Sequence, residues 1–111
     1  MPRAYTQGDV LLARLTFSSG EGQKRRPVLV AEDFGDDDLL VVPITSHAAR
    51  TEGDIVLSEW KEAGLKLPST VRVEKFATIE KSCIERNLGR LATAESAEFK
   101  RVLAMVCRRF L

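Results

Sequence analysis

The apolar residues of this chain are concentrated in short runs of strand length, and this pattern limits the possible folds more than any other feature. The runs are rich in Val, Leu and Ile and are bounded by turn-forming residues, which is typical of β-strands in a compact core. They cover residues 9–15, 27–31, 39–44, 54–57 and 69–74. The sequence therefore predicts five or so short strands.

One helical pattern is present, and it follows the last of these runs. Thr93 is a plausible N-cap, and the residues after it place one apolar stripe on a helix: Phe99, Val102, Leu103, Val106 and Phe110. A length of 111 residues leaves room for one core, so we expect a single domain over residues 1–111. Short antiparallel strands with one terminal helix predict a mainly β fold, a small sheet closed as a curled barrel with the helix packed on it.

The connections follow from turn-forming residues. Residues 16–26 are polar, glycine-containing and end in three cations, which predicts an exposed positive loop. Residues 34–38 predict a tight hairpin connection. Ser58 is expected to cap one helical turn that Gly64 ends, Thr78 to cap a second short turn through residues 80–85, and residues 88–91 to form a last strand or turn.

Composition excludes several classes of protein. Lys and Arg number 17 against 16 Asp and Glu, so any nucleic-acid binding must come from a local patch. Cys83 and Cys107 have no metal-ligand spacing and are expected to be reduced thiols. No apolar run is of membrane length, which predicts a cytoplasmic protein. Phosphate-loop, nucleophile-elbow and zinc-protease motifs are absent from the sequence, and we expect neither a metal nor a cofactor.

A group of polar residues is expected to gather at one edge of the sheet, where it suits an anion such as phosphate. Alternation along residues 69–74 predicts that Arg72 and Glu74 point the same way. Ordinary surface salt bridges, each worth about 0 to 1 kcal/mol, are the competing interpretation. His47 is either one proton-transfer partner or a surface side chain. The group consists of Glu21, Gln23, Lys24, Arg25, Arg26, Thr45, Ser46, Arg72 and Glu74.

The order of short motifs resembles the MazF/PemK/Kid toxins of bacterial type II toxin–antitoxin pairs. Each motif alone is weak, but together they span about residues 7–106 in one uninterrupted order. The motifs are Gly8-Asp9-Val10, Arg26-Pro27-Val28-Leu29-Val30, Val42-Pro43-Ile44-Thr45-Ser46, Gly64-Leu65, Pro68-Ser69-Thr70-Val71-Arg72, Thr78-Ile79-Glu80-Lys81 and Leu88-Gly89-Arg90-Leu91.

The resemblance implies an SH3-like barrel, a homodimer, a cognate acidic antitoxin and metal-independent cleavage of single-stranded RNA. Trp60, Phe76 and Phe110 are apolar candidates for the dimer contact. The catalytic positions of the family fall on Arg26 and Thr45, and those of its Kid-like branch on Arg72 and Glu74. RNA contacts are expected from Glu21, Gln23, Lys24, Arg25, Ser46 and His47.

In this interpretation the ribose 2′-hydroxyl attacks the adjacent phosphorus and leaves a 2′,3′-cyclic phosphate. Arg26 stabilises charge, Thr45 donates to a non-bridging oxygen, Glu74 is the candidate base and Arg72 a second phosphate contact or the proton donor. Two other hypotheses stay open. One is a catalytically inactive barrel that binds RNA or an antitoxin peptide, and the other is an inhibitor of a protein target, like the gyrase poisons.

Overall fold

The computed structural model describes residues 4–16 and 22–111, which form an antiparallel sheet and one α-helix. Two short 3-10 helices interrupt the second half of the chain. In chain order the elements are β1 (Asp9–Thr16), β2 (Gln23–Asp33), β3 (Asp38–Thr45), β4 (Asp54–Leu57), β5 (Ser69–Arg72), η1 (Val73–Lys75), β6 (Ala77–Glu80), η2 (Lys81–Cys83), β7 (Ile84–Arg90) and α1 (Thr93–Arg108). No helix in the described ranges is both long and apolar enough to cross a lipid bilayer.

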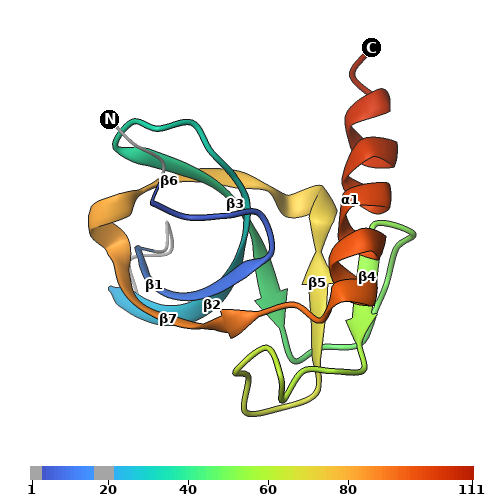
Figure 1. The fold of residues 1–111 in the computed structure, drawn as a ribbon, viewed down its shortest axis with the longest axis horizontal. Coiled ribbons are helices and arrows are strands. Elements are labelled where there is room, and N and C mark those ends of the chain that lie inside the picture. The colour runs from blue at the N-terminus through green and yellow to red at the C-terminus, as the bar shows by residue number, and fades with distance from the viewer. Residues whose placement is uncertain (1–3, 17–21) are drawn as a thin grey trace.

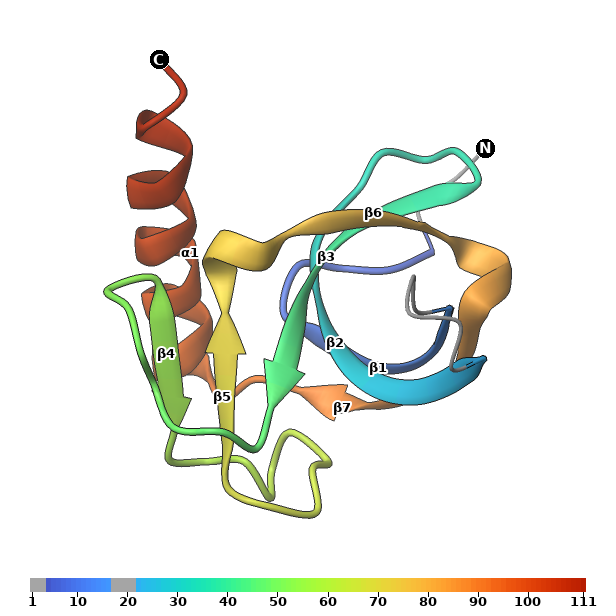
Figure 2. The ribbon, with the colours of Figure 1, turned by 180° about the vertical axis from the view of Figure 1, so that it is seen from behind.

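The sheet curls because β3 pairs with different strands along its length. Its first half pairs with β6, its last residues pair with β5, and its other edge pairs with β2. β1 then lies between β2 and β7. Strands β1, β2, β3, β6 and β7 form a ring, while β4 and β5 stand beside α1 (Figures 1 and 2). The predicted fold, a curled antiparallel sheet with a C-terminal helix, is confirmed, with seven strands in the described part of the chain.

Alternation along the central strands divides the core into two clusters. One cluster consists of Leu11, Ala13, Val28, Val30, Leu39 and Val41, which come from β1, β2 and β3. Their neighbours in sequence turn to the opposite face, where Val10, Leu29 and Val42 pack with Phe99 of α1. Because side chains alternate along a strand, the same three strands supply both clusters. The sheet is therefore fixed from both sides.

The terminal helix α1 has the predicted apolar stripe, but both of its ends differ from the prediction. Ala92, not Thr93, is the N-cap residue, and its carbonyl accepts a hydrogen bond from Ser96 N at 2.8 Å. Phe99, Val102 and Val106 are buried, whereas Phe110 lies beyond the helix and is 68% exposed. Its ring contacts Phe76 edge to face, with 5.8 Å between ring centroids.

The predicted turn after Ser58 is present, but its capping group comes from α1. Leu65 N donates to Trp60 O at 3.0 Å, and Gly64 ends the turn with a φ of +83°. The carboxylate of Glu95 accepts hydrogen bonds from Ser58 N at 2.7 Å and from Glu59 N at 3.3 Å. A Cβ on Gly64 would lie 1.9 Å from Leu88 O, so only glycine fits there.

Two expected connections differ from the prediction in their bounds. Residues 23–26 continue β2 instead of belonging to the loop, and they pair with residues 13–16 of β1. These residues are exposed, so no buried face imposes the alternation by which the sequence would show a strand. The second short turn is present as η2 over Lys81–Cys83, but Thr78 does not cap it, because residues 77–80 form β6 and pair with the first half of β3.

The buried carboxylate of Asp33 links the segment before β1 to η2. Asp33 is 1% exposed and accepts hydrogen bonds from the backbone N–H groups of Ala4 at 2.8 Å and Tyr5 at 3.0 Å. Lys81 of η2 lies 2.8 Å from the same carboxylate. Burial raises the pKa of Asp33, but the hydrogen bonds from Lys81 and the backbone amides outweigh it and hold the pKa well below its ordinary range.

We expect Asp33→Asn to unfold more easily than the wild type at pH 7, with the difference shrinking in acid. A carboxyl group whose pKa is lowered in the folded state stabilises that state above its unfolded pKa, about 3.9. This contribution is lost as the pH falls towards the folded pKa. Urea unfolding of both proteins at pH 7 and pH 3 measures it, and a difference that is equal at the two pH values would contradict the assignment.

Candidate active site

A groove rich in cations lies where β2, β3, β5 and β7 approach the segment around Leu65. It has a volume of about 710 Å³. The positively charged residues that line it are Arg25, Arg26, Lys66, Arg72 and Arg86, together with the imidazole of His47. Among the described lining residues there is no Asp or Glu. We call this the cation groove, and its charge suits a polyanion.

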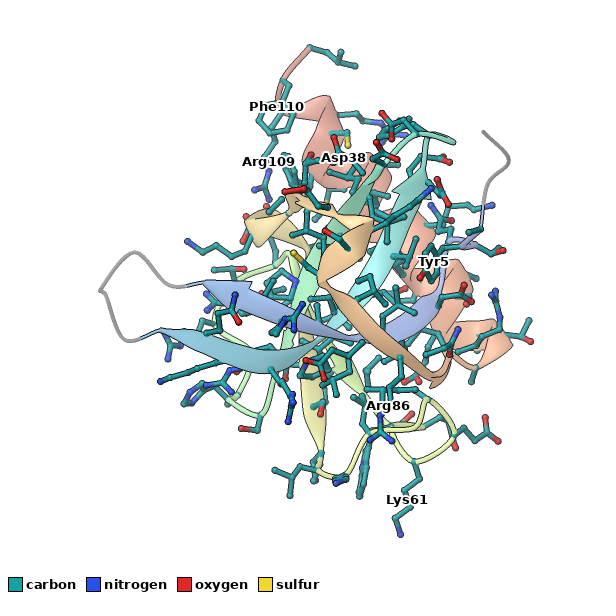
Figure 3. All side chains as sticks on the ribbon, turned by 90° about the vertical axis from the view of Figure 1, so that its left-hand side faces the viewer. Tyr5, Asp38, Lys61, Arg86, Arg109 and Phe110 are labelled. Carbon is teal, nitrogen blue, oxygen red and sulfur yellow. The ribbon has the colours of Figure 1, made fainter. Side chains whose placement is uncertain are left out.

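Strand register brings three of its lining residues together. Leu12 of β1 pairs with Pro27 of β2 on one side and with Arg86 of β7 on the other. Residues directly opposite one another in an antiparallel sheet project to the same face, so Arg86 stands one strand away from the Pro27 position. Figure 3 shows Arg86 on the side of the molecule where the loop carrying Lys61 lies.

The hydroxyl of Thr45 is held at the end of β3. Thr45 pairs with Thr70 of β5, which fixes its backbone in the sheet. Its Oγ1 accepts a hydrogen bond from His47 N at 3.2 Å. Since a hydroxyl both accepts and donates, the O–H of Thr45 can still donate to an anion in the groove. The same backbone turn carries Ser46 and His47 into the groove lining.

Asp54 connects Arg72 to the loop between β3 and β4. The Asp54 side chain is 2% exposed, and its Oδ1 lies 3.9 Å from Arg72 Nε. Its Oδ2 accepts hydrogen bonds from the backbone N–H groups of Arg50 at 2.9 Å and Thr51 at 3.4 Å. One buried carboxylate therefore ties the guanidinium of Arg72 to the loop that begins at Ser46.

Arg25 and Arg26 lie near the start of β2, and both line the groove. Arg25 Nε lies 2.9 Å from the carboxylate of Glu85, which is also 3.9 Å from Arg14. Arg26 donates from one terminal nitrogen to Arg25 O at 3.1 Å. These contacts leave both side chains exposed, as β2 extends beyond the core.

Glu74 does not reach the groove, and the prediction that it points the same way as Arg72 is wrong. Val73 is buried and donates to Gly53 O at 3.0 Å, in register with the pairing of β4 and β5, and the chain then forms η1. The carboxylate of Glu74 instead binds the hydroxyl of Thr51 and the guanidinium of Arg109. Arg109 and Arg86 lie at opposite ends of the molecule in Figure 3.

This second carboxylate network has its own electrostatics. The hydrogen bonds from Thr51 and Arg109 hold the pKa of Glu74 below its ordinary range. The Glu74 carboxylate in turn raises the pKa of Arg109, which also binds Glu52. A Cβ on Gly53 would lie 2.4 Å from Glu74 Cγ, so the glycine leaves the space that this carboxylate occupies.

The structure thus gathers most of the predicted site and separates the rest. Arg26, Thr45 and Arg72 line one groove with Arg25, Ser46 and His47. Gln23 lines a second groove, and Lys24 is in the lining of neither. Glu21 lies outside the described residues. Within the described part of the chain, no three His, Cys, Asp or Glu side chains are grouped as metal ligands.

Sequence reasoning missed Arg86 and Lys66, which both line the cation groove. The strand β7 was expected only from residue 88, and it begins at Ile84. Residues 84–90 contain no apolar alternation, and only their pairing with β1 shows that Arg86 belongs to the sheet. Lys66 belongs to an irregular segment, whose position no periodicity specifies.

These features define a small curled β-barrel protein with a groove lined by cations. The family of PemK-like, MazF-like toxins of type II toxin–antitoxin systems matches residues 6–107. The chain belongs to this family. Comparison with curated protein sequences gives no significant match.

Solved structures with the same fold come from several bacteria. An endoribonuclease in complex with its cognate antitoxin from Mycobacterial species has a TM-score of 0.76 and 17% identity, over 94% of this chain and 95% of that chain. The Mycobacterium tuberculosis toxin MazF-mt6 has a TM-score of 0.74 and 20% identity, over 90% and 96%. A MazE-MazF structure from Deinococcus radiodurans has a TM-score of 0.76 and 19% identity, over 96% and 97%.

Replacing Asp54 tests how the cation groove is held. We expect Asp54→Ala to lower the free energy of unfolding by about 1–3 kcal/mol, since it leaves loop N–H groups and a guanidinium without their acceptor. Asp54→Asn keeps one oxygen for the loop amides and is expected to lose less. Urea unfolding measures both, and Glu62→Ala, an exposed acid, serves as the control with a change within about 0.5 kcal/mol. An Asp54→Ala protein as stable as this control would show that the carboxylate does not hold the loop.

Proposed function

We propose that this chain is an endoribonuclease toxin that cleaves single-stranded RNA without a metal ion. The observation that carries the proposal is the convergence of Arg26, Thr45 and Arg72 on one groove. Family membership supports it, as does the description of structural neighbours as endoribonucleases. These three residues are distant along the chain, and a groove lined by cations and hydroxyls has the chemistry that a phosphodiester requires.

The proposed reaction is an internal transfer of the phosphodiester. The ribose 2′-oxygen attacks the neighbouring phosphorus, the bond from phosphorus to the 5′-oxygen breaks, and a 2′,3′-cyclic phosphate and a 5′-hydroxyl result. One proton leaves the 2′-hydroxyl and one reaches the departing 5′-oxygen, so the protein must handle two proton transfers. It must also stabilise the extra negative charge of the phosphorane.

The groove supplies charge stabilisation from fixed positions. Arg26 and Arg72 are assigned to the non-bridging oxygens, because a guanidinium donates two parallel hydrogen bonds and keeps its charge. Thr45 donates its O–H to one of the same oxygens, since its Oγ1 already accepts from His47 N. Arg86 and Lys66 hold neighbouring phosphates of the chain, which makes binding dependent on salt.

His47 is our candidate for the proton of the 2′-hydroxyl. Glu74 does not suit this role, because its carboxylate is bound by Thr51 and Arg109 away from the groove. Imidazole exchanges protons near neutral pH, and His47 lines the groove next to Thr45. Arg72 then acts as a phosphate contact, with the proton for the 5′-oxygen coming from solvent or from the imidazolium.

The partners proposed are single-stranded RNA, a second copy of the chain and an acidic antitoxin. Two of the structural neighbours are described with an antitoxin or as MazE-MazF. An acidic, largely disordered segment would bind the cation groove by charge complementarity and cover Arg26 and Thr45. Of the apolar candidates for the dimer contact, Trp60 and Phe76 pack partly buried against the core, and Phe110 is exposed.

Arg26→Ala is the central test of the proposed function. We expect wild-type protein in EDTA to cleave labelled single-stranded RNA to ends with a 2′,3′-cyclic phosphate and a 5′-hydroxyl. Loss of one preorganised donor should slow cleavage about 100- to 1000-fold. Arg101→Ala, which removes an exposed arginine of α1, is the matched control and should cleave at the wild-type rate. RNA that stays intact with the wild-type protein, whether bound or not, would overturn the proposal.

His47→Ala and His47→Gln test the proton transfer. General base catalysis contributes about 100- to 10,000-fold, so both variants should lose at least 100-fold in kcat. Single-turnover rates of the two variants and the wild type measure the loss. A His47→Gln protein with the rate of the wild type would show that another group takes the proton.

A further inference from the structure

A second groove opens beside the cation groove, between the β1–β2 hairpin and the segment from η1 to η2. Its volume is about 710 Å³. Its apolar lining includes Val28 and Val41, which are buried in the core, and Ala77 and Ile79, which are not buried. Its polar lining includes Gln23 and Ser82. We call this the side groove.

The side groove and the cation groove are adjacent. Leu15 and Pro43 line both of them. Pro43 is two residues before Thr45 on β3, and alternation places their side chains on the same face of the strand. Gln23 is three residues before Arg26 on β2, a separation of about 10 Å along an extended strand. A chain of nucleotides bound at Arg26 and Thr45 would therefore continue into the side groove.

The charges of the side groove differ from those of the cation groove. Arg14 and Lys75 stand in its lining, and Glu80 is the one carboxylate among the described residues there. Lys75 is exposed, and Arg14 lies 3.9 Å from Glu85. An apolar surface with two cations and a side-chain amide suits a nucleotide, because the base needs apolar contact and edge hydrogen bonds while its phosphate needs a cation.

We infer that the side groove is a nucleobase subsite that sets the sequence preference of cleavage. This inference rests on the proposed function, since the RNA must first bind the cation groove. The base of a nucleotide flanking the cleaved bond lies against Ala77 and Ile79, the apolar lining residues of this groove that are not buried. Gln23 reads the edge of that base through its amide, which both donates and accepts. Lys75 binds a phosphate of the same strand.

Gln23 and Lys75 have different proposed roles, so each role can be tested by a separate variant. Gln23→Ala should relax the preference for the base flanking the cut by about 10-fold or more, because a base-edge contact discriminates between bases. Cleavage sites are mapped on a long single-stranded RNA of known sequence, and the frequencies of the flanking bases are compared with those of the wild type. Asn87→Ala removes an exposed amide outside both grooves and should keep the wild-type preference.

Lys75→Ala should weaken binding to all sequences equally and reduce the salt dependence of binding. Loss of one phosphate contact lowers the slope of log affinity against log salt by about 1. The affinity is measured for a 2′-deoxy oligonucleotide, which the enzyme cannot cleave, at salt concentrations from about 50 to about 200 mM. Lys100→Ala, an exposed lysine of α1, is the matched control and should keep the wild-type slope.

The outcomes distinguish a failure of the proposed subsite from a failure of the proposed function on which it rests. Relaxed base preference in Gln23→Ala together with a reduced slope in Lys75→Ala supports the subsite. Unchanged preference in Gln23→Ala and an unchanged slope in Lys75→Ala, with a wild-type protein that cleaves, would overturn the subsite alone. A wild-type protein that leaves RNA intact would overturn the proposed function, and the subsite with it. Circular dichroism of each variant shows whether it is folded.

Discussion

Repulsion between like charges is the constraint on which the site depends. Arg25, Arg26, Arg72 and Arg86 share one groove with no carboxylate among its described lining residues. Groups of one sign repel, and partial burial strengthens the repulsion because it lowers the local dielectric. The folded chain must hold these side chains by other means, and it does so through the register of paired strands. Core packing on both faces of β1, β2 and β3 fixes that register.

The elements that bury apolar residues could be predicted from the sequence. The elements made mainly of exposed residues could not. The strand at Asp54–Leu57 and the stripe through Phe99 and Val106 each obey one periodicity, and the structure contains both. β6 and the first half of β7 carry exposed residues and are strands because a partner strand lies beside them. Pairing of this kind is a long-range contact, and no local pattern records it.

The same distinction between elements with and without a local apolar pattern explains which site residues could be predicted. Arg26 and Thr45 stand next to strongly patterned strands, so their convergence could be expected once the strands were assigned. The prediction for Glu74 extends the alternation of β5 two residues beyond the end of that strand. The backbone instead forms η1 from Val73, directly after the last residue of β5. Alternation predicts side-chain direction only while the strand lasts.

The carboxylates nearest the cation groove contact its arginines in a consistent manner. Asp54 approaches Arg72 at Nε, and Glu85 accepts a hydrogen bond from Arg25 Nε. A guanidinium has five N–H donors, and a carboxylate at Nε leaves the end-on pair of terminal N–H groups for a phosphate. A carboxylate at Nε therefore orients the side chain and offsets part of the repulsion while it leaves donors for the phosphate. The groove combines a high density of positive charge with fixed geometry, and both are needed to stabilise charge that develops during the reaction.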